Sequence, residues 1–265
     1  MRDRVDILGV GVDRISGEVL HAEMLRLVQR GGRAMFLNVN AHLLNLSYHR
    51  PWLRNLLNNA HIVHCDGMGV VLAAKILGRP RLEQASYSNE IFRLWELAVL
   101  HNLSIFFLGA RPGVANKAAV RLREEYSGLN VVGVHHGYFD HTPGSAENEA
   151  VIKEINAANP NILIVCFGMP LQELWLKNNW ERLNANLAIP LGGMFDYYSG
   201  RFWDGDIRRG PLIMRNNGFE WLARLVISPR RLWRRYLIGN PLFLLRVLGQ
   251  RLSEIGLLER INLLR

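Results

Sequence analysis

Cysteine is scarce in this sequence, which has only two in 265 residues. Cys65 and Cys166 both stand inside apolar runs, and neither has a partner residue at metal-binding spacing. We therefore expect two buried structural thiols and neither a disulfide framework nor a metal centre. A reducing cytoplasm fits this count.

Long hydrophobic runs are also missing, since no stretch approaches the ~18 uninterrupted apolar residues of a transmembrane helix. The first residues carry charge before any long apolar run begins, so we expect no signal peptide. Hydrophobic residues nevertheless make up 49% of the chain, which is ample for the core of one large domain, alone or with an appendage.

Lysine is absent from the last quarter of the chain, where the positive charge is concentrated. Residues 201–265 contain 13 arginines and 5 acidic residues, a balance of +8, whereas residues 1–200 have a balance of +1. Arginine is suited to bidentate phosphate binding, so the segment is predicted to bind nucleic acid, an anionic membrane or a phosphorylated ligand. Its many aromatic and aliphatic residues exclude a disordered, solvated tail.

Short apolar runs alternate with helix-length amphipathic segments along the first 200 residues. This alternation predicts an α/β fold, a Rossmann-like parallel sheet with helices on both faces. Strands are expected at 5–12, 34–39, 61–65, 105–108, 131–134, 162–167 and 187–191, with helices at 17–30, 70–77, 89–101, 113–126 and 145–159.

The composition changes near Gly200, where the strand-like runs stop and arginine-rich amphipathic segments begin. Pro211, Pro229 and Pro241 punctuate this part, and each can open a new helix. We therefore predict a catalytic or binding domain over 1–200 and a helical C-terminal appendage over 201–265.

Ligands of open parallel sheets bind beyond the carboxyl ends of the strands, where five of the expected strands lead into glycine or polar residues. Glycine at such a place lets a backbone N–H approach a phosphate or a sugar. The candidate residues are Asn40, Asp66, Gly67, Gly109, Gly113, Gly168, Gln172, Gly192 and Gly193.

Asp66 follows its expected strand directly and allows two interpretations. Its carboxylate could accept a proton from a hydroxyl nucleophile, or it could cap a helix that starts near Gly69. Position alone leaves both open. Asp196 has the same ambiguity, and there a structural role is favoured. Gly9 and Gly11 lack the third glycine of a dinucleotide fingerprint, so a simple turn is expected.

Three arginines of the last quarter, Arg224, Arg231 and Arg234, could converge on a pyrophosphate. Arg231 and Arg234 are three residues apart and so share one helix face, while Arg224 lies on the preceding helix. The alternative is a positive face on lipid headgroups, which we assign to Arg230 and Arg235. His64, His135 and His136 have no partner at ligand spacing, so no metal site is expected.

Eight motifs, in this order, resemble the WecG/TagA/CpsF family, which is glycosyltransferase family 26. The resemblance extends from about Asp6 to about Val247, nearly the whole chain. The motifs are NVNAH from Asn38, HCDGMGVV from His64, FLGARPGVA from Phe107, HGYF from His136, GMPLQE from Gly168, GGMFD from Gly192, EWLAR from Glu220 and PRRLWRRY from Pro229.

The resemblance implies an enzyme that moves a sugar from a UDP donor to a lipid-diphosphate-linked sugar on the cytoplasmic face of the membrane. Typical donors are UDP-N-acetylmannosamine, its uronic acid and UDP-glucose, and the products feed teichoic acid, enterobacterial common antigen or exopolysaccharide synthesis. Such enzymes are similar to inverting, metal-independent transferases. They need no cofactor, because the UDP-sugar is a co-substrate, and they have a membrane-targeting appendage.

The resemblance also implies roles for single residues. Asp66 matches the proposed catalytic base, and Asn40 matches the asparagine expected to contact the donor sugar or the acceptor. The motif glutamine is Gln172, and the arginines that act on the diphosphate match Arg224, Arg231 and Arg234.

Three departures from the family pattern leave the donor sugar open, but not the reaction class. Asn38 replaces the usual threonine, Leu171 replaces a lysine or arginine, and 86–90 reads SYSNE where the family usually has a Gly-Ser-Asp run. We expect Asn38 and residues 86–90 to lie near the sugar. The acceptor, the linkage and a homo-oligomeric state also stay open.

Two other classes compete with a transferase. A nicotinamide-dependent oxidoreductase needs the dinucleotide fingerprint that is missing. A non-catalytic module that binds lipid or nucleic acid agrees with the basic segment, but it leaves Asp66 and Gln172 without a purpose. Nucleic acid is therefore not expected as a partner.

Overall fold

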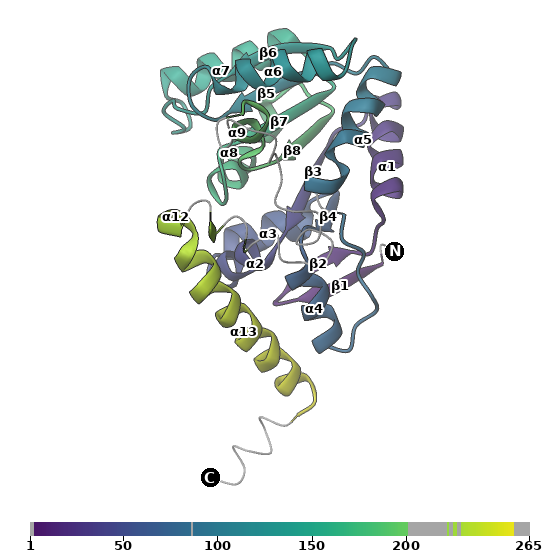
Figure 1. Cartoon of the computed structure of the whole chain (residues 1–265), viewed down its shortest axis with the longest axis vertical. Helices are drawn as coiled ribbons and strands as arrows, with labels where there is room; N and C mark the ends of the chain where they lie inside the picture. Colours follow the sequence, from purple (N-terminus) through teal and green to yellow (C-terminus); the bar gives the residue numbers. More distant parts are fainter. Residues whose placement is uncertain (1–2, 86, 201–221, 223–224, 227–228, 257–265) are drawn as a thin grey trace. The chain divides into compact units, whose positions relative to one another are not determined.

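The computed structural model of the chain describes residues 3–85, 87–200, 222, 225–226 and 229–256 (Figure 1). The chain forms two compact units. The first unit combines Met1–Ser16, Asn38–Ser86 and Arg209–Arg265, and the second combines Gly17–Leu37 and Tyr87–Arg208. The predicted boundary near residue 200 borders residues outside the described ones and stays a prediction.

Six strands form the main sheet in the order β4-β3-β8-β7-β5-β6, and the pairs β3–β8, β8–β7, β7–β5 and β5–β6 are parallel. Every residue of the strands β5, β7 and β8 is buried, which explains their unbroken apolar sequences. With helices around the sheet, the predicted α/β, Rossmann-like class is confirmed. The strands are β3 (Ala34–Val39), β4 (Ile62–Cys65), β5 (Ile105–Gly109), β6 (Val131–His135), β7 (Ile162–Cys166) and β8 (Leu187–Pro190).

The strand predicted over 5–12 is wrong, because this segment is an antiparallel hairpin of β1 (Arg4–Ile7) and β2 (Val10–Asp13). Leu8 and Gly9 lie between the strands with φ of 55° and 82°, and two positive φ angles give the tight turn that matches strand twist. The predicted turn is thus confirmed for Gly9, whereas Gly11 lies within β2 and pairs with Asp6. The Gln250 side-chain oxygen accepts a hydrogen bond from the Leu8 N–H at 2.8 Å and helps to hold the turn.

In the first unit, the long helix α13 packs against α2 and α4 (Figure 1). Arg246 anchors it by donating to the backbone and side-chain oxygens of Asn45 at 3.1 and 2.9 Å, while Phe243 and Val247 are buried. The helices of this unit are α2 (Ala41–Tyr48), α3 (Pro51–Asn59), α4 (Met68–Ile76), α12 (Pro229–Trp233), a π-helical turn (Arg234–Ile238) and α13 (Gly239–Glu254).

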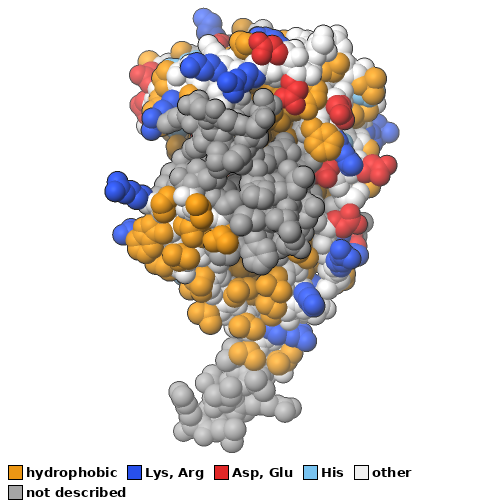
Figure 2. Space-filling model, in the orientation of Figure 1, with side chains coloured by type: hydrophobic (Ala, Val, Ile, Leu, Met, Phe, Trp, Pro, Cys, Tyr) orange, Lys and Arg blue, Asp and Glu red, His pale blue; other side chains and the backbone are white. Residues whose placement is uncertain are grey.

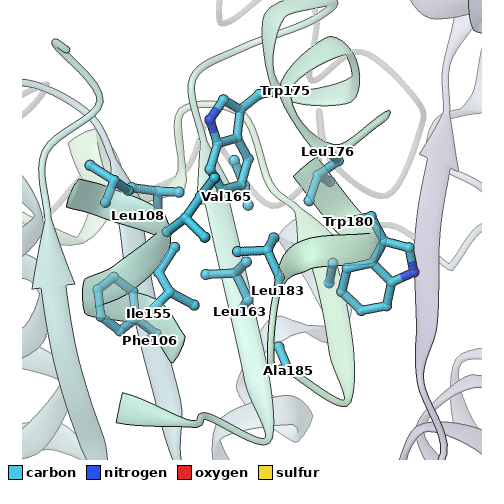
Figure 3. Packing of buried hydrophobic residues seen from close by; sticks show 13 residues of the cluster. Phe106, Leu108, Ile155, Leu163, Val165, Trp175, Leu176, Trp180, Leu183 and Ala185 are labelled. Atoms are coloured by element: carbon cyan, nitrogen blue, oxygen red, sulfur yellow. The ribbon is translucent and has the colours of Figure 1, made fainter. Parts of the chain in front are cut away.

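In the second unit, hydrophobic residues of the sheet pack against those of α7 and α8 (Figure 3). Trp175 lies in this core and donates from its indole nitrogen to the Asn148 side-chain oxygen at 2.8 Å. The core therefore fixes α8 beside the sheet. The helices are α1 (Gly17–Gln29), α5 (Tyr87–Leu100), α6 (Val114–Glu125), α7 (Ala146–Ala158), α8 (Leu171–Asn179), a 3-10 turn (Trp180–Arg182) and α9 (Met194–Tyr198).

Candidate functional site

Asp66 directly follows β4 and is not the cap of the next helix. Helix α4 begins at Met68, and its N-cap is Gly67, which has a φ of 123° and makes no side-chain cap hydrogen bond. A glycine at this φ separates Asp66 from the helix, since other residues rarely adopt such a conformation. The N-cap position that the sequence left open for Asp66 therefore belongs to Gly67.

Asn38, near the end of β3, has a side chain that contacts Asp66. Its Nδ2 donates to the Asp66 Oδ2 at 3.4 Å, and the Asp66 N–H donates to the Val39 carbonyl at 2.8 Å. Asn38 is 5% exposed, and its Oδ1 has no hydrogen-bond partner among the described residues. Because a buried amide oxygen needs a partner, Asn38 presents a polar atom that a bound hydroxyl or amide could satisfy.

Asn40 is the N-cap of α2, a helix that the sequence did not predict. Its side-chain oxygen accepts from the Leu43 N–H at 3.1 Å, as is typical of an N-cap asparagine. His42 follows in the first turn, where burial and then the charges of Arg235 and Arg50 lower the pKa of the imidazole to about 4. His42 is consequently neutral at neutral pH. A substrate contact by Asn40 stays a prediction.

The three predicted diphosphate arginines lie only partly within the described residues. Arg224 is outside them, and so is the side chain of Arg231 in α12. Arg234 is exposed at the start of the π-helical turn, with its guanidinium 5.3 Å from the centre of the Trp233 ring. The convergence of these arginines on one diphosphate stays a prediction.

Glycines at the strand ends of the second unit have backbone conformations that other residues rarely adopt. Gly109 ends β5 with a φ of 144°, and a Cβ there would lie 2.5 Å from the Cys166 carbonyl oxygen at the end of β7. Gly113 is the left-handed N-cap of α6, whereas Gly193, the N-cap of α9, has an ordinary φ of −94°. Gly109 is thus required for the close approach of β5 to β7.

Gln172 lies in the first turn of α8 and ties two of these turns together. Its side-chain oxygen accepts from the Gly168 N–H at 3.2 Å and from the Gly192 N–H at 3.0 Å. Gly168 follows β7 and Gly192 follows β8. The sequence predicted that the N–H groups of Gly168 and Gly192 could bind a phosphate or a sugar, but each donates a hydrogen bond to the Gln172 side chain.

Glu173 is a candidate that sequence reasoning missed. It is fully buried, and its Oε1 accepts from the Gln172 side-chain Nε2 at 2.9 Å. Burial raises the pKa of its carboxyl to about 7. A glutamate in the first turn of a helix normally faces solvent and interacts favourably with the helix dipole, so its burial was not expected. The only sequence signal for a buried role was its position next to Gln172.

The histidines and cysteines do not assemble into a metal centre within the part of the chain that the structure describes, where no group of three potential ligands occurs. His135 pairs through its Nδ1 with the His136 carbonyl at 2.7 Å. Both cysteines are free and buried, as expected. Burial, and then the Asp66 carboxylate, raise the pKa of the Cys65 thiol to about 12, so Cys65 stays protonated beside Asp66.

The chain resembles known proteins over most of its length. The sequence model of the glycosyl transferase WecG/TagA/CpsF family matches residues 5–256. An N-acetylglucosaminyldiphosphoundecaprenol N-acetyl-beta-D-mannosaminyltransferase of Staphylococcus aureus (strain NCTC 8325 / PS 47) is 26% identical over 253 residues, covering 92% of each chain. A protein of the same name from Bacillus spizizenii is 27% identical over 219 residues, covering 83% of this chain and 80% of that one.

The family match agrees with the resemblance carried by the eight motifs. It includes the strand-end residues Asp66 and Gln172 as well as the described part of α12 and α13. Because the match extends over nearly the whole chain, it applies to both units. The chain therefore belongs to the WecG/TagA/CpsF family of glycosyl transferases.

Proposed function

We propose that this chain is an inverting, metal-independent transferase that moves a sugar from UDP to a polyprenyl-diphosphate-linked sugar. The sugar is N-acetylmannosamine, its uronic acid or glucose, and the product enters a cell-surface polysaccharide or teichoic acid. The relatives support this choice, since their names give an N-acetylmannosaminyl group and a diphosphoundecaprenol-linked acceptor. The observation that carries the proposal is Asp66, a carboxylate that directly follows β4, is not the N-cap of α4 and contacts the buried amide of Asn38.

The proposed reaction is a single in-line displacement at the anomeric carbon. The acceptor hydroxyl oxygen bonds to this carbon while the bond from the carbon to the UDP oxygen breaks. Asp66 takes the hydroxyl proton, and the departing UDP keeps the electron pair. Arginines such as Arg234 and backbone N–H groups meet the charge that develops on UDP. Asn38 donates to one oxygen of Asp66 and so helps to orient the carboxylate toward the hydroxyl.

Replacing Asp66 by asparagine tests the assignment. The variant keeps the size of the side chain and cannot accept the proton, so we expect a normal fold and a rate lower by about 10²–10⁴-fold. UDP release is measured with a panel of UDP-sugars and a soluble analogue of a diphosphate-linked acceptor, which also identifies the donor. Glu154→Gln, on the exposed face of α7, is the control. Wild-type turnover by Asp66→Asn would remove Asp66 from the role of base.

We also propose that α12 and α13 place the enzyme on the inner face of the cell membrane. Among the described residues, no helix is both long enough and apolar enough to span a bilayer. Figure 2 shows hydrophobic side chains gathered over α12 and the adjoining part of α13. The exposed ones are Trp233, Leu237, Ile238, Leu242 and Leu245. Phe243 is buried, because it lies with Val247 on the inward face of α13.

Co-sedimentation with anionic vesicles tests this placement. Exposed apolar side chains beside arginines bind the interface by burying area and by attracting anionic lipid. The variant Leu237→Ser/Leu245→Ser should therefore sediment less than the wild type, and Leu100→Ser, at an exposed leucine of α5, should not. Equal sedimentation of all three proteins would contradict the role of this face.

A further inference from the structure

In the first turn of α8, polar side chains are buried and apolar side chains are exposed. Gln172 and Glu173 are fully buried, whereas their neighbours Leu171 and Leu174 are 41% and 38% exposed. Burying polar side chains costs free energy unless their hydrogen bonds are made inside the protein. Two consecutive buried polar residues, flanked by exposed leucines, therefore indicate a specific task in this turn.

The hydrogen bonds of Gln172 fix which way its side-chain amide points. Its Oε1 accepts two backbone N–H groups, those of Gly168 and Gly192, at 3.2 and 3.0 Å. The opposite orientation would place the amide NH₂ against two donors. Because of this, Nε2 is directed to Glu173, whose Oε1 lies 2.9 Å away.

The two turns that Gln172 joins each contain a glycine with a positive φ. Gly168 and Gly192 have φ of 87° and 62°, and no atom of the described residues would lie within 4 Å of a Cβ at either position. They follow β7 and β8, which are neighbours in the sheet. The Gln172 oxygen therefore bridges two adjacent strand ends, the region where open parallel sheets bind ligands.

Glu173 completes the arrangement from inside the protein. Its Oε2 has no hydrogen-bond partner among the described residues, and its Oε1 accepts from the Gln172 side chain. A carboxyl oxygen accepts a hydrogen bond whether or not the group is ionised. The contact to Gln172 thus holds in both protonation states.

We propose that Glu173 is a positioning residue for the transfer reaction, which fixes the Gln172 amide so that its oxygen clamps the Gly168 and Gly192 turns in one geometry. The part of this inference that concerns the reaction rests on the proposed function. Glu173 itself touches no substrate. Its contribution is to preorganise two strand-end turns for the UDP-sugar, and preorganisation of a site acts mainly on binding.

The test uses the full chain and four variants. Glu173→Leu removes the acceptor, Glu173→Gln keeps an acceptor oxygen, Gln172→Met removes the clamp, and the fourth variant combines Glu173→Leu with Gln172→Met. We expect Glu173→Leu to raise the KM for the UDP-sugar about tenfold and to leave kcat within about twofold. Glu173→Gln should restore the KM, and Glu154→Leu on exposed α7 is the control.

Amide hydrogen exchange gives a readout that does not depend on activity. The Gly168 and Gly192 amides should exchange faster in Glu173→Leu and in Gln172→Met, while those within β7 and β8 keep their protection. In the double variant, KM and exchange should equal those of Gln172→Met, because one residue acts through the other.

Two results would overturn the inference. One is wild-type KM and wild-type exchange in Glu173→Leu, and the other is additive effects of the two substitutions. If the wild type transfers no sugar from any UDP donor, the proposed function fails, and exchange at Gly168 and Gly192 still decides whether the clamp exists. If Glu173→Leu does not fold, wild-type KM and wild-type exchange in Gln172→Met would overturn the inference, because the clamp through which Glu173 acts would then be without effect.

Discussion

The buried Glu173 should make the stability of this protein depend on pH in a predictable direction. Burial raises the pKa of its carboxyl from the usual 4.5 to about 7. Between these values the native protein holds a proton that the unfolded chain has released, so the free energy of unfolding falls as pH rises. At 1.36 kcal/mol for each pH unit, the whole effect is about 3 kcal/mol.

Glu173→Gln removes this titration. Relative to the wild type, the variant should therefore become more stable by about 3 kcal/mol as pH rises from below 4.5 to above 7. Urea unfolding followed by tryptophan fluorescence at a series of pH values measures the difference. Glu154→Gln, on the exposed face of α7, should follow the wild type. A constant difference between Glu173→Gln and the wild type across the series would refute the reasoning.

Two further substitutions should lower the free energy of unfolding. Gly109→Ala should cost about 2 kcal/mol or more, because its Cβ would lie 2.5 Å from a backbone oxygen at a φ of 144°. Gly113 also has a positive φ, but a Cβ there would meet no atom of the described residues within 4 Å, so Gly113→Ala should lower the free energy of unfolding less in the same urea titration. Equal losses for the two substitutions would contradict the steric argument. Arg246→Met should cost about 1–2 kcal/mol and speed amide exchange in α13, since it removes two hydrogen bonds to Asn45. Exposed Arg230→Met is its control, and unchanged exchange in α13 would show that Arg246 is no anchor.

Periodicity located the buried strands well and the short helices poorly. The runs that became β5 and β7 are apolar throughout because both faces of these strands are covered, and such a run is visible in a sequence. Helices α2 and α3 have only 8 and 9 residues and were not predicted. A segment of two turns shows too little of the 3.6-residue period to be distinguished from a loop.

The first strand was predicted wrongly for a different reason. Residues 5–12 look like one apolar strand, but the chain reverses at Leu8 and Gly9. Glycine permits the positive φ that this turn needs, whereas leucine adopts it at a cost. Contacts from distant residues, such as the Gln250 side chain on the Leu8 N–H, help to hold it there. Local sequence does not contain that contact.

The sequence by itself determined the fold class, the family and the strand-end positions of Asp66 and Gln172, because these follow from local apolar patterns and ordered motifs. Tertiary structure decided what the polar side chains do. It made Gly67 the N-cap of α4, it brought the Asn38 side chain to the Asp66 carboxylate, and it turned Glu173 inward onto Gln172. The physical reason is that a hydrogen bond needs two partners at a defined distance, and residues from separate strands reach that distance only in the folded chain.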